Sequence, residues 1–155
     1  MDGPEKPAVD SPSELKARAI RHLVRREHSR AELERKLAPH AGSAEALSAV
    51  LDLLLSKKHL SDERFAEERA RSLSRKYGAA KIRQDLRARG VSDEIISRLP
   101  AQNDLERAKA ILARKYREPA STREERAKRM RFLQSRGFSY DVINHALALS
   151  TADEQ

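Results

Sequence analysis

The sequence predicts an all-α protein made of three tandem three-helix repeats, and three observations lead to this prediction. Apolar residues recur at three- and four-residue steps through most of the chain, which is the spacing of one helix face. Capping patterns and prolines divide this spacing into short segments. The segment Leu86–Ile96 is also similar, without a gap, to the segment Leu133–Ile143, which lies 47 residues later. We expect the repeats to form an elongated, curved right-handed or solenoid-like arrangement.

The first repeat is expected over residues 12–60. Ser11-Pro-Ser-Glu14 is a capping box with Pro12 at the first helical position, so a helix begins there. Ser29-Arg-Ala-Glu32 is a second capping box, and its helix is expected to end before Pro39. The third helix, over residues 43–56, is the most apolar segment of the chain.

The second and third repeats are expected over residues 61–100 and 101–150, with first helices at 61–76 and 103–117. In each repeat a glycine, Gly90 or Gly137, stands where a helix needs a left-handed residue after its end. Each glycine is followed by an apolar residue and by a serine that can cap the next helix. Residues 1–11, which are rich in proline and polar residues, are expected to form a flexible tail, and residues 151–155 a second one.

Composition narrows the class of function. The chain has 32 basic and 24 acidic residues, a formal net charge of +8, and no cysteine. The absence of cysteine excludes disulfides, zinc ribbons and thiol nucleophiles. The basic excess favours polyanionic partners or acidic protein faces. No apolar run approaches the roughly 18 residues of a membrane span, so we expect no membrane contact and a cytoplasmic location. We also expect the protein to be a monomer.

Catalytic and metal-binding patterns are missing from the sequence. The five histidines are scattered without the spacing of metal ligands, and the five glycines form no phosphate-binding loop. We therefore expect no catalytic residue, no metal and no cofactor, and the protein is not expected to be an enzyme.

The candidate contact residues are basic side chains. Net charge is concentrated in residues 14–90, which hold 19 basic and 11 acidic residues. A basic stripe there can neutralise phosphates or dock on an acidic protein surface, although a solubilising face is an equal alternative for any single residue. Aromatic residues for stacking bases are few. The candidates are Arg18, Arg21 and Arg25 on the first helix, and Lys76, Lys81, Arg83 and Arg87 in the second repeat.

Four segments in this order resemble the regulatory protein RecX family: Arg25–Leu37, Leu60–Ala66, Tyr77–Gly90 and Leu133–Ile143. The resemblance spans roughly residues 14–149. It implies tandem three-helix repeats and a modulator, usually an inhibitor, of the RecA recombinase. Such a protein is expected to lie along the RecA–DNA filament, to contact single- and double-stranded DNA through its basic face, and to modulate strand exchange, ATP hydrolysis and filament growth.

Two other functions remain open from the residues alone. The glycine turns suit a helix–turn–helix protein that reads a specific DNA sequence, but the helices after them carry few base-reading side chains. A basic helical scaffold that binds RNA or ribosomes through charge alone would show steep salt sensitivity and no preference for a filament.

Overall fold

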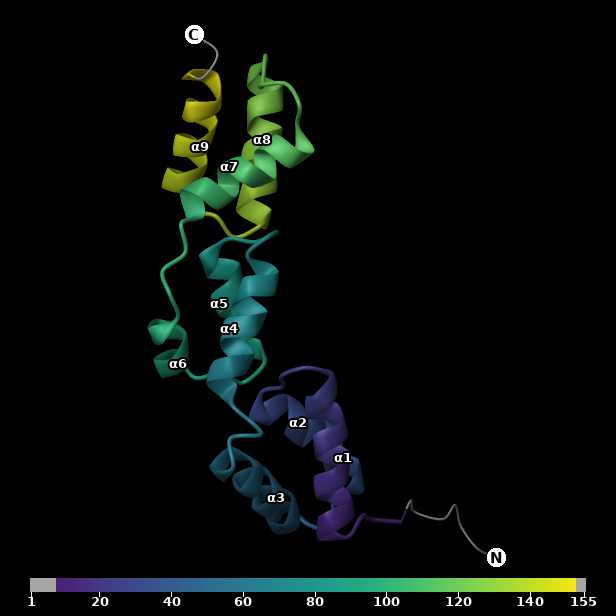
Figure 1. Ribbon diagram of the computed structural model, residues 1–155. Coiled ribbons are helices and arrows are strands. Elements are labelled where there is room, and N and C mark those ends of the chain that lie inside the picture. The colour runs from purple at the N-terminus through teal and green to yellow at the C-terminus, as the bar shows by residue number, and fades with distance from the viewer. Residues whose placement is uncertain (1–7, 153–155) are drawn as a thin grey trace, which may run out of the picture. The chain divides into compact units, whose positions relative to one another are not determined.

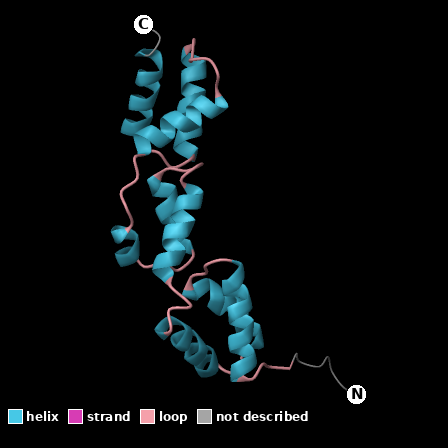
Figure 2. Ribbon diagram, in the orientation of Figure 1, coloured by secondary structure: helices cyan, strands magenta, loops and turns pink. Residues whose placement is uncertain are grey.

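The computed structural model describes residues 8–152, with side chains through residue 148, and throughout this range it holds helices and no strand (Figure 2). The prediction of an all-α protein is confirmed. The outer parts of the two expected tails, residues 1–7 and 153–155, lie outside the described residues. Within the described range, no helix has both the length and the apolar character to cross a membrane.

The described chain holds α-helices in the order that the sequence predicts (Figure 1). They are α1 (Pro12–Arg25), α2 (Arg30–Leu37), α3 (Ala44–Ser56), α4 (Asp62–Leu73), α5 (Ala79–Ala88), α6 (Asp93–Arg98), α7 (Asp104–Lys115), α8 (Arg123–Ser135) and α9 (Tyr140–Ala152), with a 3-10 turn η1 (Ala38–His40) after α2.

Local sequence sets most helix ends. Both predicted capping boxes are present, with Ser11 and Ser29 accepting hydrogen bonds from the backbone N–H of Glu14 and Glu32. Helix α4 is shorter than predicted. The N–H groups of Lys76 and Tyr77 both donate to the carbonyl of Leu73. This tight turn ends α4 at Leu73 and leaves residues 74–78 in a loop.

The chain divides into two compact units. The first contains the chain through Glu68 together with Ala88–Ser97, and the second contains Arg69–Arg87 together with the chain from Arg98 onward. Each unit therefore holds one complete group of three helices and part of the middle group.

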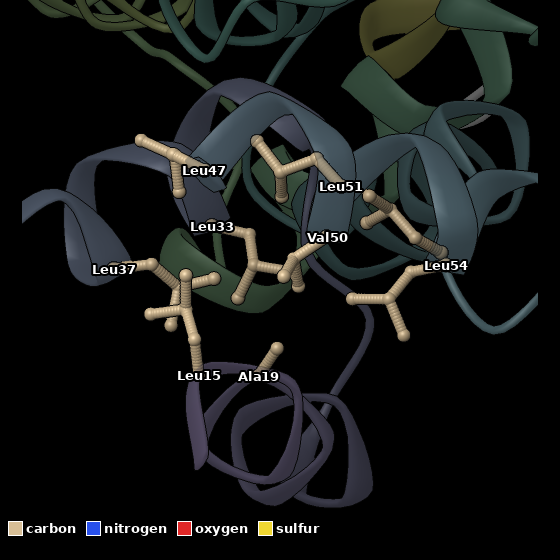
Figure 3. Packing of buried hydrophobic residues seen from close by; sticks show 9 residues of the cluster. Leu15, Ala19, Leu33, Leu37, Leu47, Val50, Leu51 and Leu54 are labelled. Atoms are coloured by element: carbon tan, nitrogen blue, oxygen red, sulfur yellow. The ribbon is translucent and has the colours of Figure 1, made fainter. Parts of the chain in front are cut away.

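Each unit has its own apolar core. In the first unit, side chains from α1, α2 and α3 converge, as Figure 3 shows for Leu15, Leu33 and Leu51. The second core lies among α7, α8 and α9, where Leu133 and Ile143 are fully buried. At about 25 cal/mol per Å² of buried apolar surface, such leucine-rich clusters supply most of the favourable free energy of folding.

The two glycine turns contact the second helix of the preceding group. Gly90 and Gly137 have φ of 86° and 90°, a conformation that other residues rarely adopt. A Cβ atom on Gly90 would overlap the Cβ of Ala31 at the start of α2. One on Gly137 would lie 2.8 Å from the backbone nitrogen of Lys81 at the start of α5. Glycine is therefore required at both turns for conformation and for close approach.

We expect Gly90→Ala to lower the free energy of unfolding by about 2 kcal/mol, measured by urea denaturation followed by circular dichroism. The alanine would be strained at positive φ and would also overlap Ala31. Gly42→Ala is the matched control. Gly42 is exposed, and its added Cβ would lie 3.7 Å from Val9 Cγ2, an ordinary contact, so a change below about 0.5 kcal/mol is expected. Equal effects of the two substitutions would contradict this account.

Candidate functional site

The two places where a glycine turn contacts a preceding helix have the same backbone design. We call them joints: the first joint comprises residues 26–32 and 89–90, and the second comprises residues 75–81 and 135–138. The carbonyl of Arg89 accepts a 2.6 Å hydrogen bond from Ser29 Oγ, and that of Arg136 accepts a 2.7 Å bond from Gly78 N. These bonds align Ser29 with Gly78 and Arg89 with Arg136, although the donor is a side-chain hydroxyl in the first joint and a backbone N–H in the second.

A second pair of contacts supports this alignment. The backbone N–H of Arg30 donates to Asp62 at the start of α4 over 2.7 Å. At the matching position, the N–H of Ala79 donates to Asp104 at the start of α7 over 3.2 Å. In both joints an aspartate thus accepts from an N–H at the start of a helix, where the helix dipole favours negative charge.

Both carboxylates of the first joint form ion pairs with arginines. Glu32, whose side chain is 10% exposed, lies 3.2 Å from Arg26 Nη2 and 2.8 Å from Arg89 Nη1. Burial by itself raises the pKa of the Glu32 carboxyl, but hydrogen bonds from Arg26 and from the Ser29 N–H, with the charges of Arg26 and Arg89, lower it to about 2. Glu27 pairs with Arg64 at 2.9 Å.

His28 completes the polar packing of the first joint. Its ring is buried, with Nδ1 3.0 Å from the carbonyl of Arg26 and Nε2 2.8 Å from Lys36 Nζ. The Lys36 ammonium can only donate, so Nε2 accepts and the ring is neutral, with its proton on Nδ1. Burial, opposed by the hydrogen bond to Arg26 and joined by the charges of Arg26 and Lys36, lowers the pKa of His28.

The second joint replaces both carboxylates of the first by lysines. Lys76 stands at the position of Glu27, and Lys81 at the position of Glu32. The arginines that match Arg26 and Arg89, namely Arg75 and Arg136, are retained. The same arrangement of turn and helix thus carries ion-paired charge in one joint and concentrated positive charge in the other.

These cations border a groove of about 450 Å³ in the second unit. We call it the cationic groove. Within the described part of the chain, no carboxylate lines it. Its lining comes from the loop after α4, the end of α7 and the end of α8, and consists of Arg75, Lys76, Tyr77, Ile111, Arg114, Lys115, Phe132 and Arg136.

Two aromatic rings of the groove contact its cations Lys115 and Arg136 and the neighbouring Lys81. Lys115 Nζ lies 3.7 Å from the centre of the Phe132 ring. The Arg136 guanidinium lies 5.1 Å from the same ring and 5.4 Å from the ring of Tyr77. Lys81 Nζ lies 5.0 Å from the Tyr77 ring and donates to the carbonyl of Ser135 over 2.9 Å. Cation–π contacts of this kind contribute about 0.5–1 kcal/mol each where they are exposed.

Backbone carbonyls fix the loop that carries Arg75 and Lys76. Arg114 Nη2 donates to the carbonyl of Arg75, and Arg107 Nη1 donates to the carbonyls of Ser74 and Tyr77. Arg107 also forms an ion pair with Asp104 within α7. The backbone of the loop is therefore bound to α7 at several points. Because this backbone is already ordered, the loop loses less conformational entropy when it binds a ligand.

The structure places two of the predicted contact residues at the second joint: Lys76 lines the groove, and Lys81 lies beside Tyr77. Arg83 and Arg87 are exposed on α5 but do not line it. On α1, Arg21 and Arg25 are exposed. The remaining one, Arg18, contacts Asp10 at 2.7 Å and 3.3 Å, so a carboxylate already balances its charge.

Sequence reasoning missed most of the groove. Arg75, Arg114, Lys115 and Arg136 were not among the predicted contact residues, and neither was Phe132. Alignment of the first joint with the second would have revealed the exchange of Glu27 and Glu32 for lysines.

A larger hollow of about 510 Å³ lies elsewhere in the second unit, against Tyr116 and Pro119. Its lining mixes Glu106 and Glu118 with Lys109, Arg117 and Arg129, so positive and negative charges largely cancel there. The cationic groove is therefore the stronger candidate for binding a charged partner.

The fold and this groove define a class: an all-helical protein of tandem three-helix domains with a concentrated basic site. Family models agree. Residues 61–98 match the second three-helix domain of RecX, and residues 102–147 match the third. The chain belongs to the RecX family of regulatory proteins.

Individual relatives cover nearly the whole chain. It is 42% identical over 139 residues to the regulatory protein RecX of Ralstonia nicotianae, covering 88% of this chain and 87% of the relative. It is 42% identical over 146 residues to that of Herbaspirillum seropedicae, covering 92% and 95%. The crystal structure of RecX from Lactobacillus salivarius has a similar fold, with a TM-score of 0.78, 23% identity, and coverage of 91% of this chain and 97% of that one.

The ion pairs of Glu32 predict acid sensitivity of the first joint. In the folded protein the pKa of the Glu32 carboxyl is about 2, whereas its ordinary value is 4.5. The unfolded chain therefore takes up the proton first, and stability present above pH 4.5 is lost as the pH falls toward 2. We expect Glu32→Gln to be on the order of 3 kcal/mol less stable than the wild type at pH 7. This gap should close by about pH 2 in urea titrations.

The control is Glu34→Gln, an exposed carboxylate on the same helix. It should change stability little at either pH. A stability gap for Glu32→Gln that stays constant across the acid range would contradict the role of its ion pairs.

Proposed function

We propose that this protein regulates the RecA recombinase, as an inhibitor, by binding along the RecA–DNA filament and modulating strand exchange, ATP hydrolysis and filament growth. Membership of the RecX family across nearly the whole chain carries the proposal. The protein acts as a monomer in the cytoplasm, where it meets RecA filaments.

The charge distribution supports a filament as the partner. A RecA–DNA filament presents protein surface and DNA phosphates side by side, and the cationic groove offers a site for the phosphates. Exposed Arg21 and Arg25 on α1, with Arg83 and Arg87 on α5, are the further contacts that we propose.

A helix–turn–helix function fits less well. The helix after the first glycine turn, α6, has six residues. In the helix after the second, α9, Ile143, Ala146 and Leu147 are buried in the core of the second unit. The cations of the groove come from the loop after α4, the end of α7 and the residue that follows α8, so they do not lie on either helix that would enter a major groove.

Addition of the protein below the RecA concentration is expected to reduce the ATP hydrolysis that RecA carries out on single-stranded DNA. The measurement is a coupled ATPase assay, with electron microscopy of the same filaments to follow their length. Unchanged hydrolysis and unchanged filament length at equimolar protein would refute the proposal. Equal binding to naked DNA and to filaments would favour the charge-only alternative.

Reversing charge on α5 tests whether this face contacts the filament. We expect Arg83→Glu with Arg87→Glu to raise the concentration for half-maximal inhibition about tenfold, because each change replaces attraction for an anion by repulsion. The matched control is Arg35→Glu with Lys57→Glu, which alters net charge equally at exposed positions of the first unit. Unchanged inhibition by the α5 variant, with its helical content intact, would remove this face from the contact surface.

A further inference from the structure

Positive charge is far more concentrated around the cationic groove and the second joint than around the first joint. In the first joint, Glu32 pairs with both Arg26 and Arg89. Glu27 pairs with Arg64 of α4. Lysines occupy the two matching positions in the second joint. Five cations from three segments line the groove, with Lys81 beside it. Like charges held together disfavour one another, and an anion relieves this cost. The arrangement therefore points to an anionic ligand.

The number and kind of cations indicate an anion with several charged groups. A single small anion would contact only a few of these side chains. A chain of phosphates can contact arginines through their forked donors and lysines through their compact charge. Each neutralised phosphate also releases counterions, which adds a sequence-independent, salt-sensitive contribution to affinity.

The aromatic rings of the groove are already in use. Lys115 and Arg136 contact the Phe132 ring, and Arg136 and Lys81 contact the ring of Tyr77. A base that stacked on either ring would compete with these cations. The rings therefore position charge, and a base would have to displace a cation to stack on them in its place.

We propose that the cationic groove binds the phosphodiester backbone of a nucleic-acid strand without stacking its bases, so that DNA, RNA and an abasic phosphodiester chain are accepted alike. This inference deepens the proposed function, because the strand inside a RecA filament presents such a backbone. Its test uses the protein alone, so failure here and failure of RecA regulation are separate results.

The experiment measures fluorescence anisotropy of a labelled oligothymidylate titrated with the full chain. Unlabelled competitors of equal length are oligothymidylate, oligouridylate and an abasic phosphodiester oligomer. We expect the three to compete within about twofold of one another, since the shared backbone provides the contacts. A tenfold weaker abasic competitor would show that bases are bound and would overturn the proposal.

Charge reversal locates the site. Lys76→Glu with Lys115→Glu changes two exposed residues of the groove. We expect about tenfold weaker binding, and a slope of log affinity against log salt that is shallower by about 1.4, at about 0.7 for each lost phosphate contact on a single strand. Arg35→Glu with Lys57→Glu changes net charge equally and should keep the wild-type affinity and slope.

Equal losses in the two double variants would assign binding to net charge and refute the groove. An oligoglutamate peptide that displaces the strand at lower concentration than an oligonucleotide of equal charge would identify an acidic protein segment as the occupant instead.

A measurement on the wild type covers the case in which the groove variant does not fold. Acetylation of lysines, followed by mass spectrometry, should show protection of Lys76 and Lys115 but not of Lys57 when the strand is bound. Equal protection of all three, or of none, would contradict the proposal.

Discussion

Close contact between a glycine turn and the start of a helix in the preceding group is the constraint on which the architecture depends. Gly90 approaches Ala31, and Gly137 approaches Lys81, too closely for any side chain larger than hydrogen. The approach brings one carbonyl, that of Arg89 or Arg136, within hydrogen-bond distance of the residue before the helix. The donor to this carbonyl is the Ser29 hydroxyl in the first joint and the backbone N–H of Gly78 in the second, and the two joints also differ in the charge of their side chains.

One arrangement of turn and helix thus carries different charge in the two joints. In the first joint, the largely buried Glu32 carboxylate pairs with the partly exposed Arg26 and Arg89 and stabilises the fold. In the second joint, Lys81 takes the corresponding position, and the stabilisation from ion pairs is exchanged for a concentrated positive charge. Residues retained for binding commonly cost stability in this way.

Local patterns made the helices predictable, whereas the candidate site depended on contacts between distant segments. The capping boxes at Ser11 and Ser29 and the turn at Gly137 act within a few residues, so a single sequence contains their full physical cause. The groove requires Phe132 and Arg136 to meet Lys115 and Tyr77, which helical periodicity does not reveal. The contact between Arg18 and Asp10 was equally unpredictable, because Asp10 lies in a segment that composition assigned to a flexible tail.

A joint is also a physically favourable place for a binding site. A lysine or arginine on an exposed helix face, such as Arg21 on α1, loses side-chain freedom when it contacts a ligand, and this loss offsets much of the electrostatic gain. In the cationic groove, which adjoins the second joint, Lys115 and Arg136 already contact an aromatic ring, and Arg114 donates to the backbone carbonyl of Arg75. Part of the entropy cost of ordering these side chains is therefore met during folding. Equal charge in the groove should for this reason bind an anion more tightly than on a helix face.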